Sequence, residues 1–327
     1  MKPKILVARA IFPEVLEYLS LHFEVEANQD DQPWSTAELR ARLQGKQGLF
    51  STAGEIIAAD LIKACPHLQV IANMAVGYNN IDLDAATRAG IIVTNTPDVL
   101  NETTADFAWA LLMAAARRVG ESERWLRAGQ WARWRHDAFL GTDLHGATLG
   151  ILGMGRIGQA IARRALGFDM QVLYHNRTRL PATLEAAANH AQYVEKDALL
   201  RRADHLLLVL PYSAATHHAI GAAELALMKP TATLVNIARG GIVDDAALIM
   251  ALRERRIAAA GLDVFENEPA FHPDFLALEN VVLTPHIGSA SGSTRRAMAA
   301  CAADNLIAGL AGQVPVNLLN PQVLRGA

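Results

Sequence analysis

The sequence predicts an α/β protein of two domains, each built on a parallel sheet with helices on both faces. The first observation is that short β-branched runs alternate with helix-like stretches along the chain. The second is that 327 residues exceed the usual size of one hydrophobic core. The third is a composition of 51% hydrophobic and 19% charged residues, which allows both domains to bury a core. We therefore expect two Rossmann-like, doubly wound sheets.

The N-terminal part of the chain contains the first series of elements. The expected strands are 4–7, 24–27, 48–52, 68–73 and 91–95. The expected helices between them are 13–21, 36–43, 60–64 and 82–89. Each connection is long enough for a crossover between parallel strands, so this series forms one open sheet.

A long apolar helix is expected at 103–118, as a spacer between the domains. The following segment, 121–135, is amphipathic and contains Trp125, Trp131 and Trp134. It is interpreted either as a partly buried helix and loop or as a subunit interface, where aromatic residues are enriched.

A second series of strands is expected at 147–153, 170–174, 205–210, 233–238, 259–264 and 281–284. The last helix-like stretch, 294–310, lies beyond this series and is expected to return to the first domain. The predicted boundaries are therefore 1–98 with 287–327 for the first domain and 99–286 for the second.

Several classes of function are disfavoured by composition. A net charge of −3 with scattered basic residues argues against nucleic-acid binding, and no run of eighteen apolar residues predicts a membrane span. Two distant cysteines, Cys65 and Cys301, favour a reducing compartment, so we expect a cytoplasmic protein. No metal site is expected, because adjacent His217 and His218 do not share a helix face and no Cys-x-x-Cys occurs.

A Gly-x-Gly-x-x-Gly run follows the strand at 147–153 and precedes a helix-like segment. Its members are Gly153, Gly155 and Gly158. The first permits a tight turn, the second lets the backbone approach a pyrophosphate, and the third lets helix and strand pack closely. The helix N-terminus adds amide donors and a favourable dipole. This context predicts a dinucleotide site.

The preferred cofactor is predicted from the end of the next strand, where an NAD site usually places an acid against the ribose 2'-hydroxyl. Here the chain has Asn176, Arg177 and Thr178, with no carboxylate. Arg177 with its two neighbours suits a 2'-phosphate through charge-assisted hydrogen bonds. We therefore expect NADPH, with NADH as a weaker cofactor; alternatively, Arg177 is a solvated loop residue.

Several segments together resemble the D-2-hydroxyacid dehydrogenase family, and within it the bacterial glyoxylate/hydroxypyruvate reductases. The resemblance covers nearly the whole chain. Besides the glycine loop, the segments are Ala75–Asp82, Asn236–Gly241, Gly261–Pro269 and Thr284–Ser289. The resemblance implies a discontinuous, flavodoxin-like substrate-binding domain and a Rossmann dinucleotide-binding domain.

By this resemblance the catalytic residues are Arg239, Glu268 and His286. Hydride transfer to a keto carbon leaves negative charge on oxygen, and an imidazole can deliver the proton near neutral pH. Glu268 would hold the other ring nitrogen and fix its tautomer. Arg239 presents a planar fork of donors that suits a carboxylate and polarises the adjacent carbonyl.

The same resemblance assigns further contacts. The backbone amides of Ala75, Val76 and Gly77 would hold the substrate carboxylate, and Trp134 would enter the substrate pocket of a partner subunit in a homodimer. Besides the loop and strand-end residues already named, the implied cofactor contacts are Thr104, Arg156, Ile157, Leu210, Pro211, Thr216, Ala238, Asp263 and Gly288.

The expected activity is NADPH-dependent reduction of glyoxylate or hydroxypyruvate to the D-2-hydroxy acid. The alternative within the family is reduction of 2-ketogluconate, because the sequence does not fix the pocket volume. A different class also stays open: relatives of this fold act as dinucleotide-sensing corepressors that bind peptides, so the fold alone does not decide the function.

Overall fold

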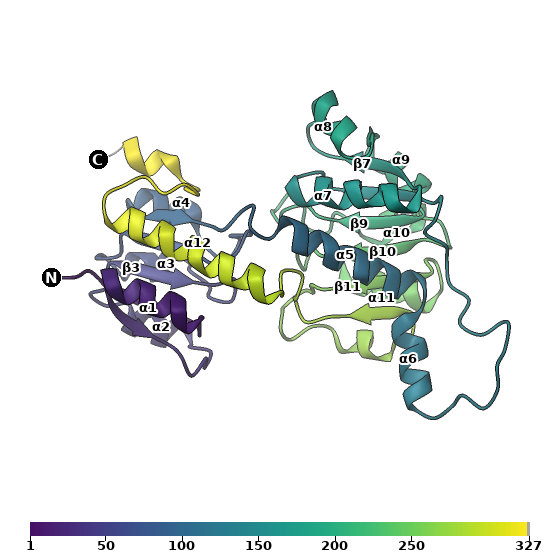
Figure 1. Cartoon of the computed structure of the whole chain (residues 1–327), viewed down its shortest axis with the longest axis horizontal. Helices are drawn as coiled ribbons and strands as arrows, with labels where there is room; N and C mark the ends of the chain where they lie inside the picture. Colours follow the sequence, from purple (N-terminus) through teal and green to yellow (C-terminus); the bar gives the residue numbers. More distant parts are fainter. Residues whose placement is uncertain (326–327) are drawn as a thin grey trace. The chain divides into compact units, whose positions relative to one another are not determined.

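The computed structural model describes residues 1–325, and the chain divides into two compact units. Unit 1 comprises residues 1–100 and the segment from Ala290 onward, and unit 2 comprises Asn101–Ser289. Each unit contains one parallel sheet with helices (Figure 1). The predicted fold class, two parallel-sheet α/β domains, is confirmed.

The sheet of unit 1 has the strand order β2-β1-β3-β4-β5, with all neighbours parallel, which is the flavodoxin-like order. Its strands are β1 (Lys4–Val7), β2 (Glu24–Ala27), β3 (Gly48–Ser51), β4 (Val70–Asn73) and β5 (Ile92–Thr94). Its helices are α1 (Pro13–His22), α2 (Thr36–Arg42), α3 (Ala59–Lys63), α4 (Leu83–Arg88) and α12 (Gly292–Leu310), followed by the 3-10 turn η3 (Pro321–Arg325).

The core of unit 1 follows from the alternation of side chains along its strands. Ile5 and Val7 pack with α1 and α12 on one face, whereas Leu6 packs with α2, α3 and α4 on the other. Helix α12 contacts β3 and β4, although it comes from the opposite end of the sequence. Unit 1 is thus assembled from both ends of the chain.

The sheet of unit 2 has the order β12-β11-β10-β9-β6-β7-β8, again parallel throughout. The order reverses between β6 and β9, which is the switch point where open α/β sheets bind ligands. The strands are β6 (Thr148–Leu152), β7 (Gln171–His175), β8 (Gln192–Tyr193), β9 (His205–Leu208), β10 (Thr233–Asn236), β11 (Ala259–Leu262) and β12 (Val281–Leu283).

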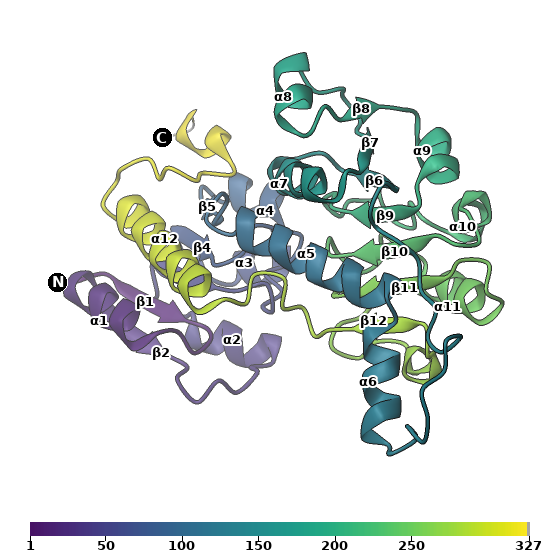
Figure 2. The same cartoon turned by 45° about the vertical axis from the view of Figure 1, so that its right-hand side comes forward.

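Helices cover both faces of this sheet. The helices are α5 (Asn101–Ala116), α6 (Val119–Arg127), α7 (Arg156–Arg164), α8 (Ala182–Ala187), α9 (Lys196–Arg202), α10 (Ala222–Leu227) and α11 (Asp245–Arg253), with the 3-10 turns η1 (Ala165–Phe168) and η2 (Pro273–Ala277). Figure 2 shows α9, α10 and α11 on the side of the sheet away from α5. Each face has its own buried apolar cluster, as a parallel sheet requires.

Two features of unit 2 add to the sequence-based expectation. Strand β8 was not predicted, because two residues are too short to show an alternation. The tryptophan-rich segment is helical only to Arg127, and the chain turns at Gly129 with a φ of +70°. No residue of α6 is fully buried and Trp125 is half-buried, so this segment contributes little to the core of the unit.

Candidate active site

The predicted site residues of unit 2 follow the carboxyl ends of its strands. Because all the strands are parallel, these ends lie at one edge of the sheet. In chain order, Gly153 follows β6, Asn176 follows β7, Leu210 follows β9, Ala238 and Arg239 follow β10, Asp263 follows β11, and His286 follows β12. One edge therefore carries both the glycine loop and the three predicted catalytic side chains.

The glycine loop has the close backbone approaches that a bound pyrophosphate needs. Gly153 has a φ of +102°, and an added Cβ would lie 2.7 Å from the backbone N of Leu210. A Cβ on Gly158 would lie 2.4 Å from the Gly153 oxygen. Gly155 faces open space and precedes α7, whose first amides have no partner within the helix. These residues fit a dinucleotide phosphate.

The loop after β7 contains two arginines that differ in their partners. Arg179 forms two hydrogen bonds with Glu185, at 2.8 and 2.9 Å, and Glu185 also accepts a hydrogen bond from the Tyr174 hydroxyl. Arg177 is exposed and forms no ion pair or hydrogen bond with any residue in the range 1–325. Asn176 Oδ1 accepts the Met154 amide at 2.7 Å and so ties this loop to the glycine loop.

His286 and Glu268 form a direct pair. His286 Nδ1 lies 2.8 Å from Glu268 Oε2, and the second carboxylate oxygen of Glu268 accepts the Phe265 amide at 2.8 Å. Burial opposes ionisation of Glu268, but the hydrogen bond and charge of His286 outweigh it and lower the pKa of the carboxyl. The ionised carboxylate only accepts, so Nδ1 carries the hydrogen and Nε2 is the other ring nitrogen.

Arg239 is held by backbone contacts close to this pair. Its Nη1 donates to the Ala238 oxygen at 2.7 Å, and the Asn236 side chain donates to the Arg239 oxygen at 3.1 Å. Burial lowers the pKa of the guanidinium, and the charge of Glu268 opposes that shift. An arginine remains charged under these conditions, so the edge presents a fixed positive charge near an acid–base pair.

Asp263 organises the turn that carries His286. Its side chain is almost completely buried and accepts hydrogen bonds from the Thr284 hydroxyl and the Ile287 and Gly288 amides, each at 2.8 Å. Burial raises the pKa of Asp263, and these hydrogen bonds oppose the shift. His286 itself has a φ of +54°, an unusual conformation that this turn maintains. A cofactor contact for Asp263 stays a prediction.

Further predicted cofactor residues border the same edge. Thr104, in α5, has a buried hydroxyl without a hydrogen-bond partner in the structure, so it is available to a ligand group. The Thr216 hydroxyl donates to the Pro211 oxygen at 2.9 Å and accepts the Ser213 amide at 2.7 Å, which closes the loop after β9. Arg156 and Ile157 form the first turn of α7.

The loop 75–77 belongs to unit 1 and follows β4. The oxygens of Ala75, Val76 and Gly77 accept hydrogen bonds from the Thr96 amide and from the side chains of Asn95 and Asn73, respectively. The Ala75 amide donates to the Asn73 oxygen at 2.8 Å, whereas in the described part of the chain the amides of Val76 and Gly77 have no acceptor. The loop thus has its acceptors used and two donors available, a composition suited to an anion.

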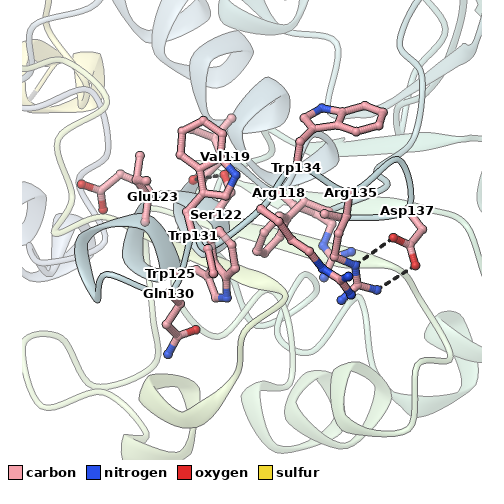
Figure 3. Close-up of a pocket in the computed structure, with 15 residues that line it drawn as sticks. Arg118, Val119, Ser122, Glu123, Trp125, Gln130, Trp131, Trp134, Arg135 and Asp137 are labelled. Atoms are coloured by element: carbon pink, nitrogen blue, oxygen red, sulfur yellow. Dashed lines mark hydrogen bonds and ion pairs between the residues drawn. The ribbon is translucent and has the colours of Figure 1, made fainter.

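A pocket of about 890 Å³ lies in a different part of unit 2, the arm, which comprises residues 118–139. Its lining includes Trp125, Trp131 and Trp134 but none of the three predicted catalytic residues. Figure 3 shows these indoles among arginine side chains, with Arg135 paired to Asp137. Trp131 is 60% and Trp134 77% exposed, so the arm presents unburied aromatic surface.

Sequence reasoning missed a polar cluster beside Glu268. Asp245, at the start of α11, accepts the Glu266 amide at 3.1 Å, and the Glu266 carboxylate lies 2.5 Å from His218 Nε2. Glu266 precedes Glu268 by two residues in the motif already quoted, which was the available signal. In residues 1–325 no cluster of three metal-ligating side chains occurs, and no helix has the length and hydropathy to cross a membrane.

A glycine loop at the switch point of a parallel sheet, with an acid–base pair and an arginine at the same edge, defines a dinucleotide-dependent α/β enzyme. The family model described as "D-isomer specific 2-hydroxyacid dehydrogenase, NAD binding domain" matches residues 109–288. The chain belongs to the D-isomer specific 2-hydroxyacid dehydrogenase family. It is an NAD(P)-dependent dehydrogenase.

Relatives match over their whole lengths. A glyoxylate reductase of Thermococcus onnurineus (strain NA1) is 48% identical over 328 residues, covering 99% of this chain and 98% of that protein. The crystal structure of a Thermus thermophilus protein has a TM-score of 0.88 at 42% identity, covering 97% and 99%. An NADPH-dependent glyoxylate/hydroxypyruvate reductase of Sinorhizobium meliloti, in complex with NADP and malonate, has a TM-score of 0.87 at 37% identity, covering 99% and 98%.

Proposed function

We propose that this chain reduces glyoxylate and hydroxypyruvate to the D-2-hydroxy acid, with NADPH preferred over NADH. The observation that carries the proposal is the His286–Glu268 pair at 2.8 Å, at the same sheet edge as Arg239 and the glycine loop. The substrate class is supported by the names of the relatives, which include glyoxylate reductases and a glyoxylate/hydroxypyruvate reductase.

In the proposed reaction, different side chains of this protein bind the substrate, polarise its carbonyl group and supply the proton. A reduced nicotinamide supplies a hydride when it is bound. Arg239 binds the carboxylate of the keto acid and polarises the carbonyl through its neighbouring donors. In the imidazolium form of His286, Nε2–H delivers its proton to the carbonyl oxygen as charge develops there, while Glu268 holds Nδ1–H and the ring orientation. The role of the Val76 and Gly77 amides in holding a substrate carboxylate stays a prediction from the family resemblance.

The side chains of the loop after β7 support the proposed preference for NADPH. Arg177 is exposed without an internal partner, while Arg179 is already engaged by Glu185. A 2'-phosphate would therefore meet one available guanidinium, with Thr178 beside it, and no carboxylate at 176–178 to repel it.

The experiment is a steady-state assay of NADPH and NADH oxidation with glyoxylate, hydroxypyruvate, pyruvate and 2-ketogluconate, compared by kcat/KM. We expect the highest values with NADPH and the two small keto acids. If kcat/KM is higher with 2-ketogluconate than with the two small keto acids, the protein is a 2-ketogluconate reductase instead. A higher kcat/KM with NADH than with NADPH would reject the cofactor assignment.

A second requirement is that His286 acts as the acid. His286→Ala should reduce kcat by about a hundredfold or more, because the proton must then come from water. His145→Ala, which changes an exposed histidine in the same unit, serves as the control and should keep normal turnover. Normal turnover of His286→Ala would reject the assigned role.

The arm supports a homodimer. Its exposed tryptophans are typical of a subunit interface, and Trp134 is proposed to enter the substrate pocket of the partner subunit. A cytoplasmic location stays a prediction, based on the small number of cysteines and their distance in sequence. A peptide-binding corepressor role has less support, because two of the three relatives named above are called reductases.

A further inference from the structure

The segment 265–268, which carries Glu268, is fixed by hydrogen bonds to Glu268 itself and to a side chain outside the proposed catalytic set. The Phe265 amide donates to Glu268 itself, and the next amide, of Glu266, donates to Asp245. The Glu266 carboxylate contacts His218 Nε2 at 2.5 Å. Two consecutive amides therefore have carboxylate acceptors, and the second acceptor comes from a separate helix.

The same segment also touches the strand end that carries Arg239. Gly240 packs so closely on it that an added Cβ would lie 1.7 Å from the Phe265 oxygen. The position of the 265–268 backbone is consequently coupled to both Glu268 and the residue after Arg239. A displacement of this backbone would move the carboxylate away from His286.

The carboxylate of Asp245 is buried, and burial is unfavourable for its charged form. It is 5% exposed, and burial together with the charges of Glu266 and Asp244 raises its pKa to about 6, against the Glu266 amide and His272. The helix dipole favours an acidic residue at the first position of α11, which is one reason for an aspartate at position 245. An exposed acid would serve that purpose equally well, so its burial against Glu266 indicates a second role.

We propose that Asp245 is a positioning residue for the Glu268–His286 pair, which it stabilises by holding the Glu266 amide. It acts through the backbone of residues 265–268 and not through a contact of its own with the substrate. The expected effect on kcat rests on the proposed function, whereas the expected effect on the His286–Glu268 hydrogen bond does not. A displacement of about 1 Å at a catalytic group is enough to reduce a rate by up to about a hundredfold.

The kinetic test compares Asp245→Ala, Asp245→Asn and Glu268→Gln. Asp245→Ala should lower kcat about tenfold and leave the KM for the cofactor within a factor of about two, because only proton delivery is misaligned. Asp245→Asn keeps an oxygen acceptor and should restore most of the activity. If Asp245→Ala does not fold, Asp245→Val replaces it, since valine is closer in volume to aspartate and cannot accept the Glu266 amide.

The double variant Asp245→Ala/Glu268→Gln separates positioning from a general structural effect. If Asp245 acts through Glu268, its loss should change kcat by less than about twofold once Glu268 is already replaced. If the reduction in kcat of the double variant equals the product of the reductions in the two single variants, the proposal is overturned. Asp274→Ala removes a carboxylate that pairs with Arg253 of the same helix and should leave kcat unchanged.

A measurement without cofactor or substrate keeps the inference separate from the proposed activity. In proton and 15N NMR, the His286 Nδ1–H bonded to Glu268 should give a low-field, slowly exchanging signal. The signal should be lost in Asp245→Ala and Glu268→Gln and retained in Asp245→Asn and Asp274→Ala. Its retention in Asp245→Ala would overturn the positioning role, whereas absence of turnover with an intact signal would reject only the proposed function.

Discussion

The proposed choice of cofactor and of proton donor depends on single residues at the edge of the unit 2 sheet. Arg177 and Arg179 are two positions apart, yet only Arg179 has an acidic partner within the fold. The availability of a guanidinium for a ligand thus depends on Glu185 and not on the number of arginines in the loop. The distinction became visible only once the partners of each side chain were known.

Replacement of Arg177 should change the preference between cofactors. Arg177→Ala should raise the KM for NADPH by about tenfold or more, because a charge-assisted hydrogen bond to phosphate is lost, and should leave the KM for NADH nearly unchanged. Initial rates with both cofactors measure this. Arg201→Ala, an exposed arginine on α9, is the control. Equal weakening of both cofactors would contradict a contact with the 2'-phosphate.

Asp245 should also make stability depend on pH. Its pKa is raised from 3.8 to about 6 in the fold, so its contribution to stability is fully present below about 4 and is lost as pH rises through 6. At pH 8 the free energy of unfolding of Asp245→Asn should therefore exceed that of the wild type by at most about 3 kcal/mol. The difference should vanish near pH 4. Denaturant titrations at four pH values would show this; a difference independent of pH would contradict the assignment.

At the scale of elements, the strand-to-helix connection of β6 and α7 was predictable in detail. The spacing of Gly153, Gly155 and Gly158 fixes a tight turn, a close approach and a packed helix within six residues. Local motifs of this kind need no knowledge of distant segments. The three predicted catalytic side chains were placed by resemblance, since nothing in their spacing shows that they reach one edge.

The cluster of His218, Asp245 and Glu266 illustrates what the sequence could not provide. These residues come from the loop after β9, the start of α11 and the segment after β11. No fixed spacing links them, and their meeting depends on the packing of the whole unit. Strand β8 was missed for a related reason, because its two residues are strand only through pairing with β7.

Two glycines of the loop allow its roles in binding and in stability to be separated. Gly155→Ala meets no atom within 4 Å and should keep the melting temperature while weakening cofactor binding, because the new methyl group occupies the approach to the α7 N-terminus. Gly158→Ala meets the Gly153 oxygen and should lower stability by about 1–3 kcal/mol. Thermal unfolding and fluorescence titration with NADPH measure the two effects. Normal affinity in Gly155→Ala would contradict the proposed pyrophosphate position.

At the scale of the whole molecule, the arm is the feature that a single chain does not explain. Val119, Leu126, Trp131 and Trp134 are each more than half exposed, although most aliphatic side chains of unit 2 are buried in two clusters. Exposed apolar surface of this kind is typical of an interaction site. A second copy of the chain is the occupant we propose, because aromatic residues surrounded by arginines match the composition of subunit interfaces.

Sedimentation velocity should therefore give twice the chain mass for the wild type. Trp131→Ser/Trp134→Ser should shift the population to monomer, since both changes remove large apolar contacts while touching no buried core residue. Leu166→Ser alters an equally exposed apolar residue outside the arm and should leave the dimer intact. If Trp134 also reaches the partner's substrate pocket, Trp134→Ser alone should raise the KM for glyoxylate at protein concentrations where the dimer persists. A monomeric wild type, or a double variant that stays dimeric, would show that the arm serves another purpose.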